Sequence, residues 1–153
     1  MVWLPTKSSR SRKECSIKGY VGAQTAGVYR STDNGDSWTP TRNGMGGTGV
    51  YALSRNRGAI FAAGRWSFYL FYNYNSGIYG DGWPLGPIFR SSEEGNTWIP
   101  LDTSHGLPLA NGWTVKAFGN WVFARTGGCG NGGCSSDPYV SSDGGDTWHF
   151  ADS

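Results

Sequence analysis

Residues 139–148 read Tyr-Val-Ser-Ser-Asp-Gly-Gly-Asp-Thr-Trp, and this stretch decides the fold. The same pattern recurs without gaps at residues 29–38, as Tyr-Arg-Ser-Thr-Asp-Asn-Gly-Asp-Ser-Trp, and at residues 89–98, as Phe-Arg-Ser-Ser-Glu-Glu-Gly-Asn-Thr-Trp. An aromatic residue begins each copy. Ser stands at the third position, Asp or Glu at the fifth, Gly at the seventh, Ser or Thr at the ninth and Trp at the tenth. Three copies of so specific a pattern indicate an internal repeat.

The motif has the chemistry of a tight turn between two strands. Its carboxylate can accept backbone N–H groups inside the turn, and its glycine supplies the positive φ that closes the turn. The tryptophan is expected to pack its large face beneath the hairpin. The structural residues predicted on this basis are Ser31, Asp33, Gly35, Trp38, Ser91, Glu93, Gly95, Trp98, Ser141, Asp143, Gly145 and Trp148.

The motif resembles the Asp box, or BNR repeat, of sialidase-like β-propellers, and the resemblance extends from about Gly19 to Phe150. It implies an all-β fold of propeller blades. Each blade has four antiparallel strands, A to D, and the Asp box joins strand C to strand D. Glu93 departs from the family pattern, which usually has Asp at this position. Its longer side chain is expected to loosen the second turn.

The segments between the motifs are predicted to form hairpins. Apolar runs at residues 50–54 and 59–63 precede the second motif, and similar runs at residues 114–118 and 121–124 precede the third. Turn residues separate the two runs of each pair, as in a hairpin. These runs are therefore expected to be strands A and B of two blades.

The first blade is less regular. Residues 20–23 and 27–30 match strands B and C, but residues 11–17, where strand A is expected, are polar and basic. That strand is expected to be degenerate, disordered or supplied by another chain. The predicted organisation is an irregular basic segment at residues 1–18 followed by propeller blades in 19–153, at about 19–42, 48–101 and 113–151.

About three blades are too few to close a propeller, which typically has four to eight. Such a chain exposes aromatic surface on two blade faces, and surface of this kind favours association. We therefore predict a homodimer in which a second chain completes a six-bladed ring with two-fold symmetry. The alternative is that the chain is a fragment of a longer propeller.

Long connections mark the face on which a ligand is expected. The B–C connection of the second blade spans residues 64–85 and is rich in aromatic residues, that of the third spans 126–137, and the D–A connection at 101–112 is also long. In a propeller these connections emerge on one face, opposite the Asp boxes. A carbohydrate could stack on the aromatic rings, or a protein could bind there. The alternative is that the aromatic insertion is a buried dimer contact or an extra hairpin. The candidate ligand-binding residues are Trp66, Tyr69, Tyr72, Tyr74, Trp83, Asp81, Asp102 and His105.

The resemblance to sialidases does not extend to their catalytic residues. Those enzymes need an arginine trio and an Arg-Ile-Pro segment, and neither is found in this sequence. The sequence therefore favours a non-catalytic binding or interaction module. One alternative is a glycoside hydrolase-like enzyme that uses Asp81, Asp102 or Asp137, with His105 as a general base. Another is a structural remnant of a longer propeller without a ligand.

Composition excludes several other classes. A net charge of +2 is low for a protein that binds nucleic acid, and the basic run at residues 7–13 is expected to be a solvated tail. No run approaches the roughly 18 apolar residues that span a membrane. The first 15 residues do not resemble a signal peptide, so a cytoplasmic location is expected unless a leader is missing.

Cys129 and Cys134 flank a glycine-rich loop and could form a local disulfide or remain free thiols. Without nearby His or further Cys residues they do not complete a metal site. The sequence predicts neither a metal nor a cofactor.

Overall fold

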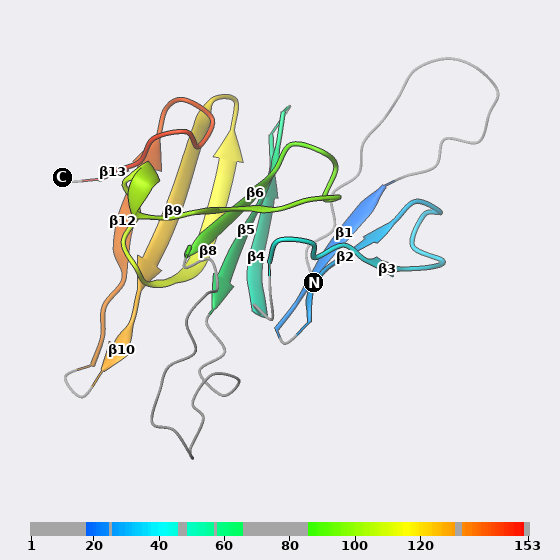
Figure 1. Cartoon of the computed structure of the whole chain (residues 1–153), viewed down its shortest axis with the longest axis horizontal. Coiled ribbons are helices and arrows are strands. Elements are labelled where there is room, and N and C mark those ends of the chain that lie inside the picture. Colours follow the sequence, from blue (N-terminus) through cyan, green and yellow to red (C-terminus); the bar gives the residue numbers. More distant parts are fainter. Residues whose placement is uncertain are drawn as a thin grey trace.

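The computed structural model describes residues 18–24, 26–45, 49–56, 58–65, 86–130 and 133–151. It contains three antiparallel sheets that stand side by side in chain order, with a short two-stranded ribbon attached to the third (Figure 1). The all-β, antiparallel architecture expected from the sequence is therefore confirmed. Closure into a ring stays a proposal.

The first sheet has three strands in the order β1-β2-β3. They are β1 (Gly19–Ala23), β2 (Gly27–Ser31) and β3 (Thr39–Pro40). By their place around the Asp box these are strands B, C and D of a blade. The region predicted for strand A, residues 11–17, lies outside the described residues.

The second and third sheets have four strands each, in the sequential order expected of a blade. The second sheet contains β4 (Gly49–Arg55), β5 (Ile60–Arg65), β6 (Ile88–Ser91) and β7 (Ile99–Leu101). The third contains β8 (Asn111–Phe118), β9 (Trp121–Gly127), β12 (Asp137–Ser141) and β13 (His149–Phe150). The remaining elements are the 3₁₀ helix η2 (Thr103–His105) and the ribbon of β10 (Cys129–Gly130) and β11 (Gly133–Cys134).

The first strands of the second and third sheets, β4 and β8, share a local irregularity. The pairing register shifts between Val50 and Ala52 in β4, and between Gly112 and Thr114 in β8. Such bulges re-aim a side chain, and here the skipped residues are Tyr51 and Trp113, whose ring centroids lie 5.9 Å apart. The repeat therefore includes these bulges, and the two bulged residues are both aromatic and lie side by side.

Apolar side chains fill the two spaces between sheets. The first cluster joins the first and second sheets, and its largest members are Tyr20, Phe89 and Trp98. The second cluster joins the second and third sheets, around Phe61, Leu107 and Trp148. The middle sheet is thus covered on both faces, whereas each outer sheet has one face without a neighbouring sheet in the described structure.

Candidate interaction surface

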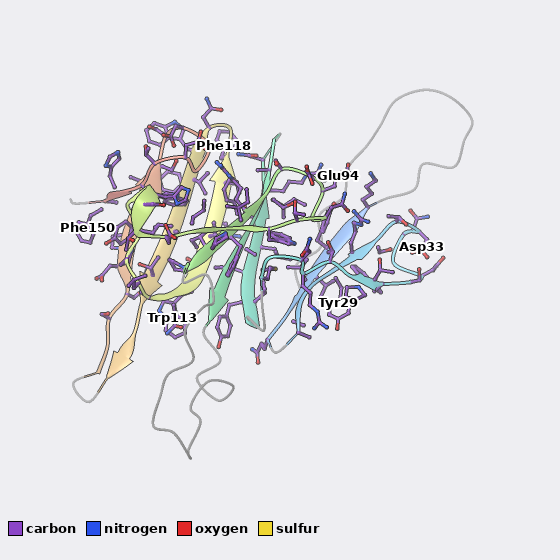
Figure 2. The ribbon with its side chains drawn as sticks, in the orientation of Figure 1. Tyr29, Asp33, Glu94, Trp113, Phe118 and Phe150 are labelled. Atoms are coloured by element: carbon purple, nitrogen blue, oxygen red, sulfur yellow. The ribbon has the colours of Figure 1, made fainter. Side chains whose placement is uncertain are left out.

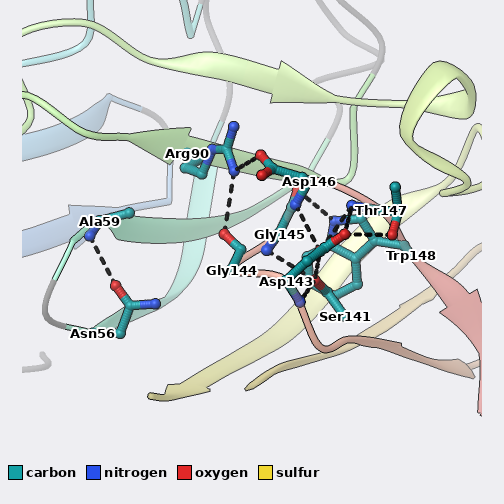
Figure 3. A network of polar contacts seen from close by, with 10 residues as sticks. All are labelled: Asn56, Ala59, Arg90, Ser141, Asp143, Gly144, Gly145, Asp146, Thr147 and Trp148. Atoms are coloured by element: carbon teal, nitrogen blue, oxygen red, sulfur yellow. Dashed lines mark hydrogen bonds and ion pairs between the residues drawn. The ribbon is translucent and has the colours of Figure 1, made fainter. Parts of the chain in front are cut away.

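Each Asp box closes on its own serine and carboxylate. In the third box the Ser141 hydroxyl donates to Asp143 Oδ1 at 2.6 Å and accepts the Gly145 N–H at 2.8 Å. Asp143 also accepts the Thr147 N–H at 3.0 Å and the Thr147 hydroxyl at 2.6 Å (Figure 3). The carboxylate thus binds both ends of the turn together.

The first box repeats this turn, because the Ser31 hydroxyl donates to Asp33 Oδ1 at 2.7 Å and accepts the Gly35 N–H at 2.9 Å. The second box keeps the serine bond and one bond to its carboxylate. The Ser91 hydroxyl accepts the Gly95 N–H at 2.9 Å, and Glu93 Oε2 accepts the Thr97 hydroxyl at 3.0 Å, so glutamate reaches the far side of the turn. The sixth residue and the seventh both have positive φ in all three boxes. The seventh is always glycine, with φ of 101°, 84° and 94° at Gly35, Gly95 and Gly145.

The hydrogen bonds hold two carboxylates in their charged form. Bonds from Ser37, through its side chain and then its backbone, lower the pKa of Asp33 to about 2. Bonds from Ser141 and Thr147 lower the pKa of Asp143 still further. A group whose pKa is depressed by folding stabilises the folded state above its unfolded pKa, and this contribution disappears as the pH falls towards the folded pKa.

We therefore predict that acid destabilises the protein through the boxes as the pH falls from about 4 to about 2. The double variant Asp33→Asn, Asp143→Asn should be less stable than the wild type at neutral pH, because an amide nitrogen then faces the N–H donors of the turn. The difference should shrink through this pH range in urea unfolding followed by tryptophan fluorescence. Asp137→Asn, which changes an exposed carboxylate outside the boxes, is the control. A difference that stays constant with pH would contradict this account.

An arginine at the second position of a box reaches across to the box of the next sheet. Arg30 Nη1 donates to the Glu94 carbonyl at 3.1 Å and to Asn96 Oδ1 at 2.8 Å. Arg90 Nη1 donates to the Gly144 carbonyl at 3.2 Å and to Asp146 Oδ1 at 2.6 Å (Figure 3). The acceptors are the sixth and eighth residues of the receiving box in both cases.

An aromatic ring next to each arginine fills the space that the box glycine leaves. Tyr20 pairs with Arg30, and Phe61 pairs with Arg90, in equivalent registers. A Cβ added to Gly95 would lie 3.2 Å from Tyr20 Cε1, and one added to Gly145 would lie 2.8 Å from Phe61 Cε1. The glycine is therefore required by the ring of the preceding sheet as well as by its positive φ.

The connection that leads into a sheet covers the tryptophan of that sheet's box. The backbone N–H of Trp98 donates to the Asn43 carbonyl, and the backbone N–H of Trp148 donates to the His105 carbonyl, both at 2.8 Å. The next residue is glycine in each case, and a Cβ on Gly44 or Gly106 would lie 2.1 Å or 2.3 Å from the carbonyl oxygen of that tryptophan. The aromatic ring, the arginine and the connection together form one interface between neighbouring sheets. This interface occurs twice in the part of the chain that the structure describes.

The open face of the third sheet presents the first half of this interface without a partner sheet. Phe123 pairs with Val140 in the register that Phe61 shares with Arg90. Phe123 is 51% exposed, whereas Phe61 is 0% and Tyr20 1% exposed. Trp121 stacks beside Phe123 with ring centroids 6.3 Å apart, and Phe118 is exposed at the adjoining turn (Figure 2). We call this surface, which also carries Lys116 and Arg125, the aromatic end face.

The open face of the first sheet presents the other half of this interface, the side formed by an Asp box and its tryptophan. Trp38 is 36% exposed, whereas Trp98 and Trp148 are 3% exposed. A Cβ added to Gly35 would meet only Trp38 Cζ2, at 3.8 Å, among the described residues. We call the surface formed by Gly35, Asp36 and Trp38 the box end face. The two end faces belong to the first and third sheets, which stand at opposite ends of the row of sheets (Figure 1).

A groove of about 970 Å³ lies between the turns of the second and third sheets, on the side of the third Asp box. Its lining includes Arg55, Asn56, Asn120 and Phe118. Asn56 Nδ2 donates to the Gly119 carbonyl at 3.0 Å, so the turns that border the groove are tied together. Arg90 and Asp146, which bond to each other across the interface between the sheets, also line it, as does Asp143 of the third box.

Most of the predicted ligand-binding residues cannot be placed. Trp66, Tyr69, Tyr72, Tyr74, Asp81 and Trp83 lie outside the described residues. Their role therefore stays a prediction.

The structure places Asp102 and His105 away from the face on which the sequence analysis put them. Asp102 caps η2, accepting the Ser104 N–H at 2.9 Å and the Ser104 hydroxyl at 2.7 Å, and these bonds lower the pKa of Asp102. The His105 carbonyl binds Trp148, so η2 lies beside β13, whereas β10 extends from the other end of the sheet (Figure 1). The cause is the hydrogen bond that the His105 carbonyl accepts from the backbone of Trp148, the tryptophan of the next Asp box.

The cysteine loop forms a small ribbon in which the backbones of Cys129 and Cys134 stand opposite each other. Within the described ranges, His, Cys, Asp and Glu side chains form no group of three or more that could hold a metal ion. No helix in the same part of the chain is long and apolar enough to cross a membrane.

Comparisons with known proteins support the fold. No protein-family model matches the sequence, and no curated protein matches it. Among solved structures, the chain is similar to one described as YCF48 bound to D1 peptide, with a TM-score of 0.56 and 15% sequence identity. The match covers 87% of this chain and 36% of that one. The chain therefore resembles part of a larger propeller, and it spans about a third of the length of the protein that it matches.

Proposed function

We propose that this chain is a non-catalytic interaction module that binds a protein through its aromatic end face. The observation that carries the proposal is the exposure of Phe123, whose register equivalents Tyr20 and Phe61 are both buried under an Asp box. Trp121 and Phe118 enlarge the same exposed surface. Contiguous apolar patches of this kind on a rigid scaffold mark sites of protein binding.

A protein surface suits this face better than a small ligand does. The face is one side of an antiparallel sheet, with apolar rings at its centre and the cationic side chains of Lys116 and Arg125 beside them. Aromatic residues with arginine nearby are typical of the centre of protein interfaces. The similar solved structure is described as bound to a peptide, so a protein with this fold can bind polypeptide.

The state of Asp102 argues against this residue as the general acid of a glycosidase. A glycosidase needs a carboxylic acid with a raised pKa to protonate the leaving group. Asp102 instead caps η2, and its pKa is lowered by the bonds from Ser104. The Asp102 carboxylate therefore stabilises the start of η2.

A second copy of the chain is one partner of the proposed kind. Two chains of three sheets supply the six sheets of a closed propeller. We propose the homodimer on this basis.

A library of random dodecapeptides displayed on phage tests the proposed function. We expect wild-type protein to enrich peptides that bind the double variant Phe123→Ser, Trp121→Ser at least about tenfold more weakly, a loss of about 1.4 kcal/mol, in fluorescence anisotropy. Leu109→Ser removes an equally exposed apolar residue outside this face and should leave the affinities unchanged. Peptides that bind all three proteins equally would contradict the proposal.

A further inference from the structure

We infer that the aromatic end face binds the box end face of a second copy of this chain. The inference rests on the proposed function and names the partner. Its basis is that the chain already contains this interface twice, between its first and second sheets and between its second and third. The two end faces are the two halves of a third copy, at opposite ends of one molecule.

The aromatic ring and the box glycine of the interface are both present, one on each end face. Phe123 has the register of Tyr20 and Phe61, which pack on Gly95 and Gly145. Gly35 occupies the same position in the first box and has φ of 101°, as the other two box glycines do within about twenty degrees. The ring of Phe123 can therefore take the place over Gly35 that the earlier rings occupy over their glycines.

Trp38 gives a second reason to expect a cover on the box end face. Trp98 and Trp148 are 3% exposed, whereas Trp38 is a third exposed, and the connection that leads into the first sheet lies outside the described residues. A large aromatic ring at this position costs free energy while it faces water. Binding of another sheet beside it would remove part of that exposed surface.

Charge favours the same pairing. The aromatic end face carries Lys116 and Arg125, both exposed. The box end face carries Asp36, which is also exposed. Opposite charges on two surfaces steer them together and disfavour pairing of either face with itself.

The polar part of the interface is incomplete, and this makes the inference testable. Arg30 and Arg90 each reach the eighth residue of the next box, Asn96 and Asp146. In the third box Val140 stands at the arginine position, while the acceptor position of the first box is filled by Asp36. A second copy thus offers a carboxylate at Asp36, whereas the wild-type chain has no arginine at position 140 to bind it.

The substitution Val140→Arg should restore this bond between two copies. We expect it to lower the dissociation constant for self-association about tenfold, measured by sedimentation equilibrium, because bonds to charged groups are the stronger hydrogen bonds. In an Asp36→Ala background, which removes the side-chain acceptor, the gain should fall below about twofold. Asp137→Asn, which removes an exposed carboxylate from the third sheet, should leave the gain intact.

Two outcomes would overturn the inference. One is a gain from Val140→Arg that does not depend on Asp36, and the other is a protein that stays monomeric with and without Val140→Arg. A Phe123→Asp variant gives an independent readout, because it should abolish self-association while the tryptophan fluorescence of the folded chain persists. If the peptides selected above still need Phe123 but the chain does not self-associate, this inference falls and the proposed function stands.

Discussion

Replacing Phe61 with alanine is expected to lower the free energy of unfolding by about 3–5 kcal/mol. The ring is fully buried between the second and third sheets, and it lies against the position of Gly145. Truncation removes its apolar contacts and leaves a cavity that the backbones of two sheets cannot close. The same substitution at Phe123, its equivalent in the third sheet, is expected to cost the monomer less than about 1 kcal/mol, because half of that ring is already exposed.

Urea unfolding at protein concentrations where the chain is monomeric measures both effects. The comparison is controlled by the fold itself, because the two residues have the same type and the same register. Equal losses at the two positions would mean that the ring of Phe123 is buried within a single chain. That result would remove the basis for treating the aromatic end face as an open surface.

Replacing Gly145 with alanine is expected to cost about 2–4 kcal/mol. The positive φ of 94° accounts for about 1–2 kcal/mol of this in a residue with a Cβ. The rest comes from the methyl group, which would lie 2.8 Å from Phe61 Cε1 and must displace the ring.

Gly35→Ala separates these two causes. Gly35 has a similar φ of 101°, but a Cβ there has an ordinary contact of 3.8 Å with Trp38. We therefore expect only the backbone cost, about 1–2 kcal/mol, in the monomer. The same variant should weaken self-association, since the added methyl group occupies the place proposed for Phe123 of a second copy. A loss at Gly35 as large as that at Gly145 would contradict the proposed role of the preceding ring.

Much of the fold could be predicted because the Asp box is a local device. Ser141, Asp143 and Thr147 bond to one another within seven residues, so the pattern in the sequence already contains the whole turn. The hairpins were predicted from apolar runs separated by turn residues. The paired strands β4 and β5, and β8 and β9, lie at these runs. The short fourth strands, such as β13, follow the turn directly and pair with the strand before it.

The interface between sheets could not be predicted in the same way, because its contacts join residues far apart in the chain. Arg90 stands in the second Asp box, but its guanidinium binds Asp146 of the next sheet. A signal was present in the repeat itself: arginine stands at this position in two boxes, and a residue with a side-chain oxygen stands at the eighth position in all three. Comparing the variable positions of the boxes would have shown that Val140 breaks this series.

The candidate ligand residues were harder to predict for a different reason. The sequence analysis placed Asp102 and His105 by the general path of a propeller connection. The structure shows that the connection uses its backbone to bind Trp148 and its carboxylate to cap η2. Those bonds depend on where the next sheet stands, and the local sequence around Asp102 does not reveal it.

The mass of the protein in solution, measured by light scattering after size exclusion, tests the central claim most directly. The claim is that the two end faces of one chain are complementary halves of a single interface. It predicts a mass of twice 16.5 kDa at high protein concentration, reduced to 16.5 kDa by Phe123→Asp. A folded wild-type chain with a mass of 16.5 kDa at every concentration would contradict it.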